Sequence, residues 1–235
     1  MARRSLVATA LLPLLLVGCA GFMSGWIHPK STPTADAFPG IEDTPSNWYH
    51  SGMSRSDVEQ LDRNLYKVSL DSFPVAEQDT DYSCWAACAE MVLDFLGHDT
   101  TQKEIIRKIK GDASPDQASP GTGLEIMRAL AGDWTHVHYD SGDSALMAID
   151  LADGWPVILA IDTGEDIGHA VVLTGMTISW QSRPGAPSLA IVHKVEVCDP
   201  TPGVGRDRWS AEEFAEKLDG AIHMRDASRA SYPGM

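Results

Sequence analysis

The chain has 235 residues, of which 18 are Lys or Arg and 33 are Asp or Glu, so its formal net charge is −15 at pH 7. This length accommodates one ordinary domain with an N-terminal appendage. The excess of acidic residues argues against binding of nucleic acid or anionic lipid through a basic surface. We therefore expect no nucleic-acid partner.

Residues 1–19 have the layout of an export signal. Two arginines form a charged start, an apolar run follows, and the segment ends in Leu-Val-Gly-Cys at Cys19. The run is too short to span a bilayer but suits the core of a signal peptide. The final box resembles a bacterial lipoprotein signal, in which the cysteine is lipidated on sulfur and becomes the new N-terminus. A cleaved, soluble secretory peptide is the alternative.

Removal of residues 1–18 takes away two basic residues and no acidic one, which leaves a formal charge of −17. We expect an exported lipoprotein that the lipid on Cys19 anchors in the cell envelope, on its periplasmic or extracellular face. The lipid is the expected contact with the membrane.

Residues 20–72 have little apolar periodicity and are rich in Pro, Ser, Thr and Asp. Such a composition cannot repay the entropy of ordering, so we interpret the segment as a partly disordered tether. Within it, residues 54–65 are predicted to form one short helix that Ser54 or Ser56 caps. The folded domain is assigned to residues 73–235.

The central stretch of this domain runs from Gln78 to Gly97. A polar turn ends at Ser83, and apolar side chains then recur at three- and four-residue spacing up to Gly97, which predicts a buried helix. Cys84 lies in its first turn, where unpaired backbone N–H groups and the helix dipole favour a thiolate. Cys84 is therefore a candidate nucleophile, and a small buried hydrophobe is the alternative. Gln78 adds an amide donor that could share an oxyanion with the Cys84 N–H.

The other elements are predicted from periodicity and turn residues. Helices are predicted over residues 101–109, 122–130, 144–152 and 210–218, and strands over residues 134–139, 157–161, 170–174 and 189–197. Because helices come first and strands second, the fold class is α+β.

The spacing of His169 and Asp199 predicts that they meet. The midpoint between them is Pro184, in the strongest turn signal of the region. If the two flanking runs pair antiparallel about this turn, His169 lies opposite or diagonal to Asp199 on one face of the sheet. The aspartate could then orient the imidazole, as the third member of a catalytic triad does. A plain turn at Asp199 and an ordinary loop histidine are the alternatives.

Two clusters are weaker candidates for metal binding. His136 and His138 would share a strand face, but the sequence near them supplies no third ligand. Asp162, Glu165 and Asp166 could chelate calcium, although a solvated acidic loop at the rim of a cleft is the preferred interpretation. We therefore expect no metal and no cofactor.

Two further cysteines are predicted to be buried free thiols. Cys88 lies one helical turn after Cys84 on the same face, whereas Cys198 neighbours Asp199 on a strand and points to the opposite face. These directions do not supply the short Cβ separation of a disulfide, although export would permit one.

Four elements in this order resemble papain-like cysteine peptidases: Gln78, the Cys84-Trp-Ala-Ala box, the run that begins at His169, and the Asp199-Pro pair. The resemblance is closest to bacteriocin-processing peptidases of double-glycine leaders and to related bacterial effector proteases. It covers about residues 73–225. It implies a papain-like fold in which an N-terminal helical part with the nucleophile helix packs on a C-terminal antiparallel sheet.

By the same resemblance, Cys84 is the nucleophile, His169 the base, Asp199 the orienting residue and Gln78 the oxyanion donor. The expected function is hydrolysis of peptide bonds through an acyl-enzyme, with peptides or proteins as substrates. An amidase or acyltransferase could use the same triad, since the triad does not choose the acceptor. A binding module that keeps the fold without activity is the remaining alternative.

Overall fold

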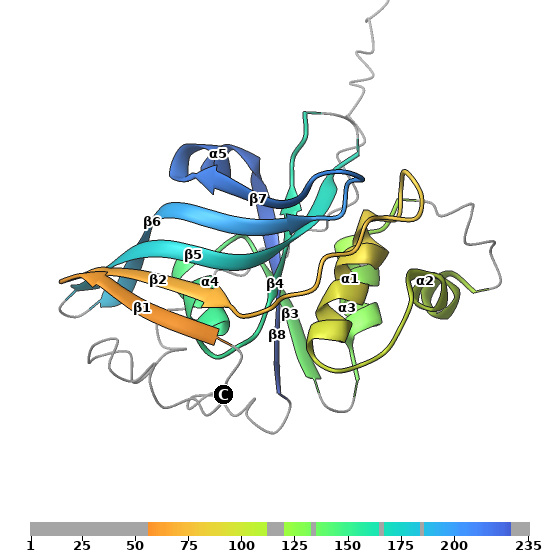
Figure 1. The fold of residues 1–235 in the computed structure, drawn as a ribbon, viewed down its shortest axis with the longest axis horizontal. Coiled ribbons are helices and arrows are strands. Elements are labelled where there is room, and N and C mark those ends of the chain that lie inside the picture. The colour runs from red at the N-terminus through yellow and green to blue at the C-terminus, as the bar shows by residue number, and fades with distance from the viewer. Residues whose placement is uncertain (1–55, 112–119, 133–134, 165–166, 184–185, 227–235) are drawn as a thin grey trace, which may run out of the picture.

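The computed structural model describes residues 56–226, except for 112–119, 133–134, 165–166 and 184–185 (Figure 1). The predicted signal, Cys19 and the first part of the predicted tether therefore lie outside the described residues. Within the described ranges, no helix has both the length and the hydropathy that a membrane crossing requires.

The fold is α+β and is built around one eight-stranded sheet whose neighbours all pair antiparallel (Figure 1). Its strands are β1 Ser56–Asp62, β2 Leu65–Leu70, β3 Thr135–Asp140, β4 Val157–Ile161, β5 His169–Arg183, β6 Ala186–Asp199, β7 Gly205–Ser210 and β8 Leu218–Asp226. The order across the sheet is β1-β2-β5-β4-β8-β3, with β6 on the other edge of β5 and β7 beyond it. The long β5 pairs with β4 along its first part and with β2 farther on.

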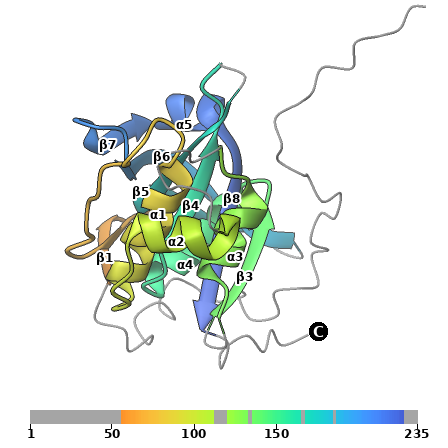
Figure 2. The same ribbon diagram turned by 90° about the vertical axis from the view of Figure 1, so that its right-hand side faces the viewer.

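Five helices lie in the described part of the chain: α1 Cys84–Phe95, α2 Gln102–Lys110, α3 Gly123–Leu130, α4 Ser144–Ala152 and α5 Ala211–Lys217. Figure 2 shows α1, α2 and α3 grouped in front of the sheet, and α1 packs directly on β5. α4 packs against β1, β2, β4, β5, β6 and β8, and α5 covers β6 and β7. The helix that begins at Cys84 is thus packed on the antiparallel sheet, as expected.

The predicted helix at Cys84 is confirmed, together with its stop signal. Gly97 has φ +89°, its N–H donates to the Asp94 carbonyl at 2.9 Å, and the His98 N–H donates to the Leu93 carbonyl at 2.8 Å. This pair of hydrogen bonds is a Schellman motif, which a glycine in the left-handed region permits. Most of α1 is buried, so Cys84 is held at the start of a rigid element.

The hairpin that was predicted around Pro184 is also confirmed. β5 ends at Arg183 and β6 begins at Ala186, and the two strands pair over their length. Val172 pairs with Cys198, so continuation of this register places His169 diagonal to Asp199. Three irregularities in the register, of the kind that β-bulges produce, lie between the turn and this end.

The helix predicted over residues 54–65 is wrong. Its described part forms β1, the turn after it and the first residue of β2, and β2 adds to the sheet by pairing with β5. Tyr66, Val68 and Leu70 are buried while the residues between them are not, which is the period-two pattern of a half-buried strand. The sheet therefore takes in residues 56–70, which the sequence analysis assigned to the tether. The sequence analysis also missed β7 and β8.

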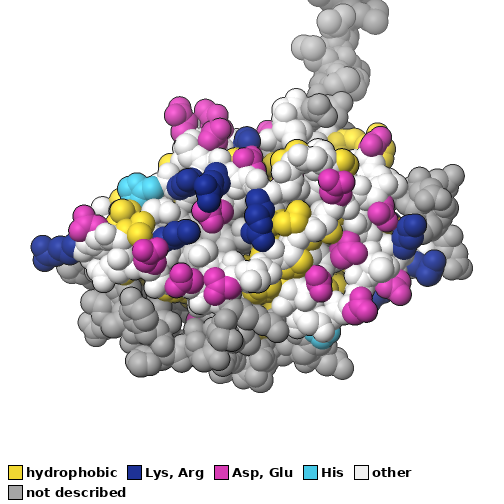
Figure 3. Space-filling view, in the orientation of Figure 1, with side chains coloured by type: hydrophobic (Ala, Val, Ile, Leu, Met, Phe, Trp, Pro, Cys, Tyr) yellow, Lys and Arg dark blue, Asp and Glu magenta, His cyan; other side chains and the backbone are white. Residues whose placement is uncertain are grey.

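Acidic side chains are spread over the face of the molecule in Figure 3, and Lys and Arg side chains gather over β5, β6 and β7. Glu196 on β6 lies between Lys67 of β2 and Arg208 of β7, with its Oε1 4.0 Å from Lys67 Nζ and 3.4 Å from Arg208 Nε.

Candidate active site

Cys84, His169 and Asp199 meet where α1, β5 and β6 come together. Cys84 is the first residue of α1, His169 is the first residue of β5, and Asp199 is the last residue of β6. His169 Nε2 lies 2.8 Å from Asp199 Oδ1, and Cys84 lines the same cleft, close enough to raise the pKa of the imidazole. The structure therefore brings the three predicted residues together in one cleft, with a hydrogen bond between His169 and Asp199.

The backbone and side chain of Thr201 hold Asp199 in place. The Thr201 N–H donates to Asp199 Oδ1 at 2.8 Å, and the Thr201 hydroxyl lies 3.3 Å from His169 Nε2. Burial opposes the charge on Asp199, but the hydrogen bonds from His169 and Thr201 outweigh it and keep the pKa of this carboxyl below its usual value. Asp199 therefore presents a carboxylate to the imidazole at neutral pH.

His169 is held in its charged form. Burial works against the imidazolium, but the hydrogen bond with Asp199, the neighbouring Cys84 and the charges of both residues raise the pKa of His169 from 6.5 to about 9. At neutral pH the ring therefore carries the proton that a leaving group would need.

The Gln78 side chain reaches the same cleft as Cys84 and His169. Its backbone N–H donates to the Pro200 carbonyl at 2.7 Å, which ties it to the loop after Asp199. Its Nε2 donates to the Thr80 carbonyl at 2.9 Å, so one of the two N–H bonds of the amide remains for another acceptor.

The residues around this site match a known family. A model of the Peptidase_C39 like family matches residues 70–217, which is more than half of the chain. The chain belongs to this family. It is accordingly a cysteine-type peptidase with a papain-like α+β fold, as the sequence resemblance implies.

The chain is also similar to two solved peptidase domains. One is the peptidase domain of Streptococcus ComA, a bifunctional ABC transporter involved in a quorum-sensing pathway: it is 20% identical, with 65% of this chain and 97% of that chain covered and a TM-score of 0.48. The other is the peptidase domain of Streptococcus mutans ComA, which is 19% identical, with 64% and 98% covered and a TM-score of 0.41. No curated protein matches the chain.

The cleft of this C39-like peptidase has a volume of about 760 Å³, within the usual range for ligand sites. It is lined by aromatic, aliphatic and charged side chains. Among them are Tyr82, Trp85, Ile167, Val204, Trp209, Asp81, Asp162, Asp207 and Lys217. Asp162 is exposed at this rim, and the calcium candidates Glu165 and Asp166 lie outside the described residues.

The three cysteines that the structure describes are free, and only Cys84 is partly exposed. Burial raises the pKa of Cys88 well above its usual value, and the charges of Cys84, Asp199 and Cys198 add to this effect. Burial also raises the pKa of Cys198, against the nearby charge of Arg206. Neither buried thiol is thus available as a thiolate nucleophile.

Two residues that support the site were missed in the sequence analysis. Gln102 on α2 is buried, and its Oε1 accepts from the Asp79 N–H while its Nε2 donates to the Glu77 carbonyl, both at 2.9 Å. These bonds fix the segment that leads into Cys84. A glutamine on the apolar face of a predicted amphipathic helix was the available signal.

The second missed residue is Gly121, which lies against the ring of Trp85. A Cβ at Gly121 would be 2.2 Å from Trp85 Cγ, so only glycine fits beside the buried ring. Because Trp85 directly follows Cys84, this contact also sets the wall of the cleft. No local sequence signal identifies such an approach, since the two residues are 36 positions apart.

Proposed function

We propose that this C39-like peptidase cleaves peptide bonds with Cys84 as the nucleophile, His169 as general acid and base, and Asp199 as the residue that orients the imidazole. The observation that carries this proposal is the hydrogen bond between His169 and Asp199 in a cleft that Cys84 also lines, close to the imidazole. A nucleophile, a base within hydrogen-bond reach and a third group that orients the base are the parts that covalent catalysis requires.

In the first half of the reaction, the Cys84 sulfur attacks the carbonyl carbon of the substrate and forms a C–S bond. The His169 imidazolium then gives its proton to the amine nitrogen as the C–N bond breaks, which leaves a thioester on Cys84. In the second half, neutral His169 takes a proton from water, the resulting hydroxide attacks the thioester, and the carboxylate product leaves as the Cys84 thiolate is restored.

The negatively charged oxygen that forms in each half of the reaction needs hydrogen-bond donors. The Ser83 carbonyl accepts the N–H groups of Ala86 and Ala87 at 2.9 Å each, so α1 begins its hydrogen bonding there. The Cys84 N–H precedes these donors, at a helix start where N–H groups have no intrahelical acceptor. We propose that it acts with the remaining N–H of Gln78 as the oxyanion hole.

The test uses a thiol reagent and an unbiased peptide library. We expect iodoacetamide or an E-64-type epoxide to label Cys84 rapidly at neutral pH in the native protein. Cys84→Ala should abolish both labelling and peptide cleavage, and His169→Ala should abolish cleavage. His193→Ala is the matched control, because His193 is an exposed histidine on β6 outside the cleft, and this variant should cleave normally.

The outcomes separate the alternatives. Slow labelling of Cys84 and no cleavage would support an inactive binding module instead. Rapid labelling, without peptide cleavage but with release of ammonia or transfer of an acyl group to an added amine, would support an amidase or acyltransferase.

We also propose that the protein is exported and that a lipid on Cys19 anchors it in the cell envelope. The charged start, the apolar run and the Leu-Val-Gly-Cys box support this proposal. Metabolic labelling with a fatty-acid analogue should mark the wild-type protein and fail to mark Cys19→Ser. Labelling that survives the substitution would refute the lipoprotein assignment.

A further inference from the structure

A second cluster of ionisable side chains lies far along the sheet from Cys84. Ile161 on β4 pairs with His169 on one side and with Leu218 of β8 on the other, so these residues mark the catalytic end. His223 is five residues farther along β8, roughly 17 Å away at the rise of a β-strand. Directly across from it on β3 is His138.

Three side chains converge at this second position. His138 and Asp140 lie two residues apart and so share a face of β3, and His223 enters from β8. One ligand atom from each lies within 4.8 Å of those of the other two. Tetrahedral ligands of a zinc ion are roughly 3.4 Å apart, given bonds of about 2.0–2.1 Å. The rings of His138 and His223 are stacked with their centroids 4.9 Å apart, so side-chain rotation would be needed to close the group on one ion.

The ligand atoms are buried and poorly satisfied without an ion. His138 Nδ1, Asp140 Oδ2 and His223 Nε2 are all buried; among the described residues His138 Nδ1 has no hydrogen-bond partner, and the other two have only each other. Asp140 Oδ2 and His223 Nε2 face each other as an ion pair at 3.1 Å. Buried polar atoms normally have partners, and a divalent ion in place of the proton between these two would satisfy them.

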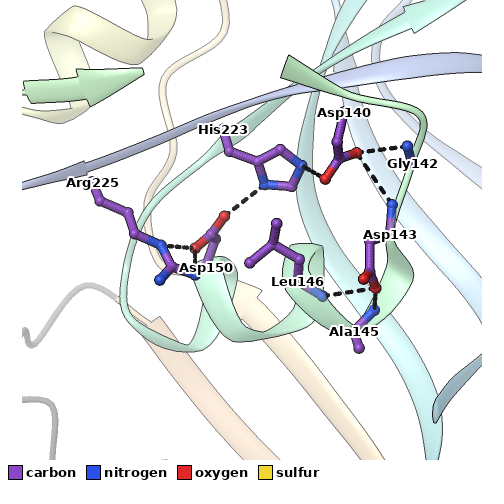
Figure 4. Close-up of polar contacts among 8 residues, drawn as sticks. All are labelled: Asp140, Gly142, Asp143, Ala145, Leu146, Asp150, His223 and Arg225. Atoms are coloured by element: carbon purple, nitrogen blue, oxygen red, sulfur yellow. Dashed lines mark hydrogen bonds and ion pairs between the residues drawn. The ribbon is translucent and has the colours of Figure 1, made fainter. Parts of the chain in front are cut away.

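Neighbouring residues hold the atoms of His223 and Asp140 that do not face the proposed ion, as Figure 4 shows. His223 Nδ1 lies 2.6 Å from Asp150 Oδ2, and Asp150 Oδ1 accepts from Arg225 Nε at 2.7 Å. This arrangement is the carboxylate–histidine pair that orients a metal-ligating imidazole and fixes which nitrogen faces the metal. Asp140 is held likewise, because its Oδ1 accepts from the N–H groups of Gly142 at 2.6 Å and Asp143 at 3.2 Å.

We propose that His138, Asp140 and His223 form a binding site for one divalent transition-metal ion, with zinc as the expected ion. Two imidazole nitrogens and one carboxylate oxygen suit zinc, and a water molecule would complete four-fold coordination. The ion would join β3, an edge strand of the sheet, to β8. The site lacks any residue of the catalytic cleft, so its role is structural.

The sequence suggested His136 and His138 as a weak metal-binding pair. In the proposed site, Asp140 and His223 take the place of His136 beside His138. His136 is exposed and is not a member of the three-residue group. The third ligand comes from a strand 85 residues after His138 that the sequence analysis did not predict.

The test measures zinc uptake by the full-length chain with Cys84→Ala, so that the catalytic thiolate cannot bind the ion. We expect one zinc ion per chain in competition with a chromophoric chelator. In the same background, His138→Ala and Asp140→Asn should each weaken zinc binding at least tenfold. Both ligands are only partly buried, and Asn at 140 keeps the Oδ1 acceptor for Gly142 and Asp143, so circular dichroism should show folded variants.

The matched control is His136→Ala, which removes an exposed histidine of the same strand and should keep full zinc affinity. Co²⁺ in place of zinc should give d–d bands without a thiolate charge-transfer band. Three results would each overturn the proposal: no stoichiometric uptake by the Cys84→Ala protein, equal affinity in the His138 and Asp140 variants, or a thiolate band in the cobalt spectrum. None of them bears on peptide cleavage.

Discussion

Substitution of Asp199 by Asn should lower the pKa of His169. Asn keeps an oxygen acceptor for the imidazole and for the Thr201 N–H but removes the negative charge. The rise of the His169 pKa from 6.5 to about 9 corresponds to roughly 3 kcal/mol in favour of the imidazolium, at about 1.4 kcal/mol per pH unit. Asp199 and Cys84 share this effect against burial, so the Asn variant should titrate at least one pH unit lower.

The measurement is a pH titration of the His169 ring by NMR of protein with ¹⁵N-labelled histidine, with His169→Gln for assignment. It needs no knowledge of the substrate. The wild-type ring should titrate near pH 9. A wild-type pKa near 6.5, or an unchanged pKa in Asp199→Asn, would refute the electrostatic argument for this site.

The same charges predict how stability depends on pH. The raised pKa of His169 stabilises the fold fully below pH 6.5, and this contribution is lost as the pH rises through about 9. The lowered pKa of Asp199 acts in the opposite sense, since its contribution is present above its usual pKa and is lost in more acidic solution. In urea unfolding, the excess stability of wild type over Asp199→Asn should therefore be largest near pH 6 and should shrink above pH 9.

Three other substitutions or measurements test the site. Gln78→Ala should lower kcat about a hundredfold with little change in the urea midpoint, as loss of one oxyanion donor does; equal kcat would remove Gln78 from the site. Gly121→Ala should destabilise the protein by about 1–3 kcal/mol, because its Cβ would overlap the buried Trp85 ring, and a midpoint unchanged in urea would show that the ring can move. Alkylation under denaturing conditions without reductant should modify both Cys88 and Cys198 in the intact mass, whereas a mass two hydrogens short with neither modified would reveal a disulfide.

Local patterns in the sequence were sufficient for the helices and for the central hairpin. The run from Cys84 to Gly97 contains its own periodicity and its own stop, and the capping boxes that open α3 and α5 lie within four residues each. The turn around Pro184 placed His169 beside Asp199, because antiparallel pairing about a turn relates residues by their distance from it. These features depend on residues that are close in the sequence, so they can be predicted from the sequence alone.

The tertiary structure decided the features that depend on distant partners. β2 forms a strand because it pairs with β5. The residues around it are polar and give no strong turn signal. β8 is buried on both faces from Ala221 to Met224, so it shows no alternation of polar and apolar residues. The contact of Gly121 with Trp85 and the meeting of His138 with His223 likewise arise only when separate elements pack, because no short-range pattern encodes them.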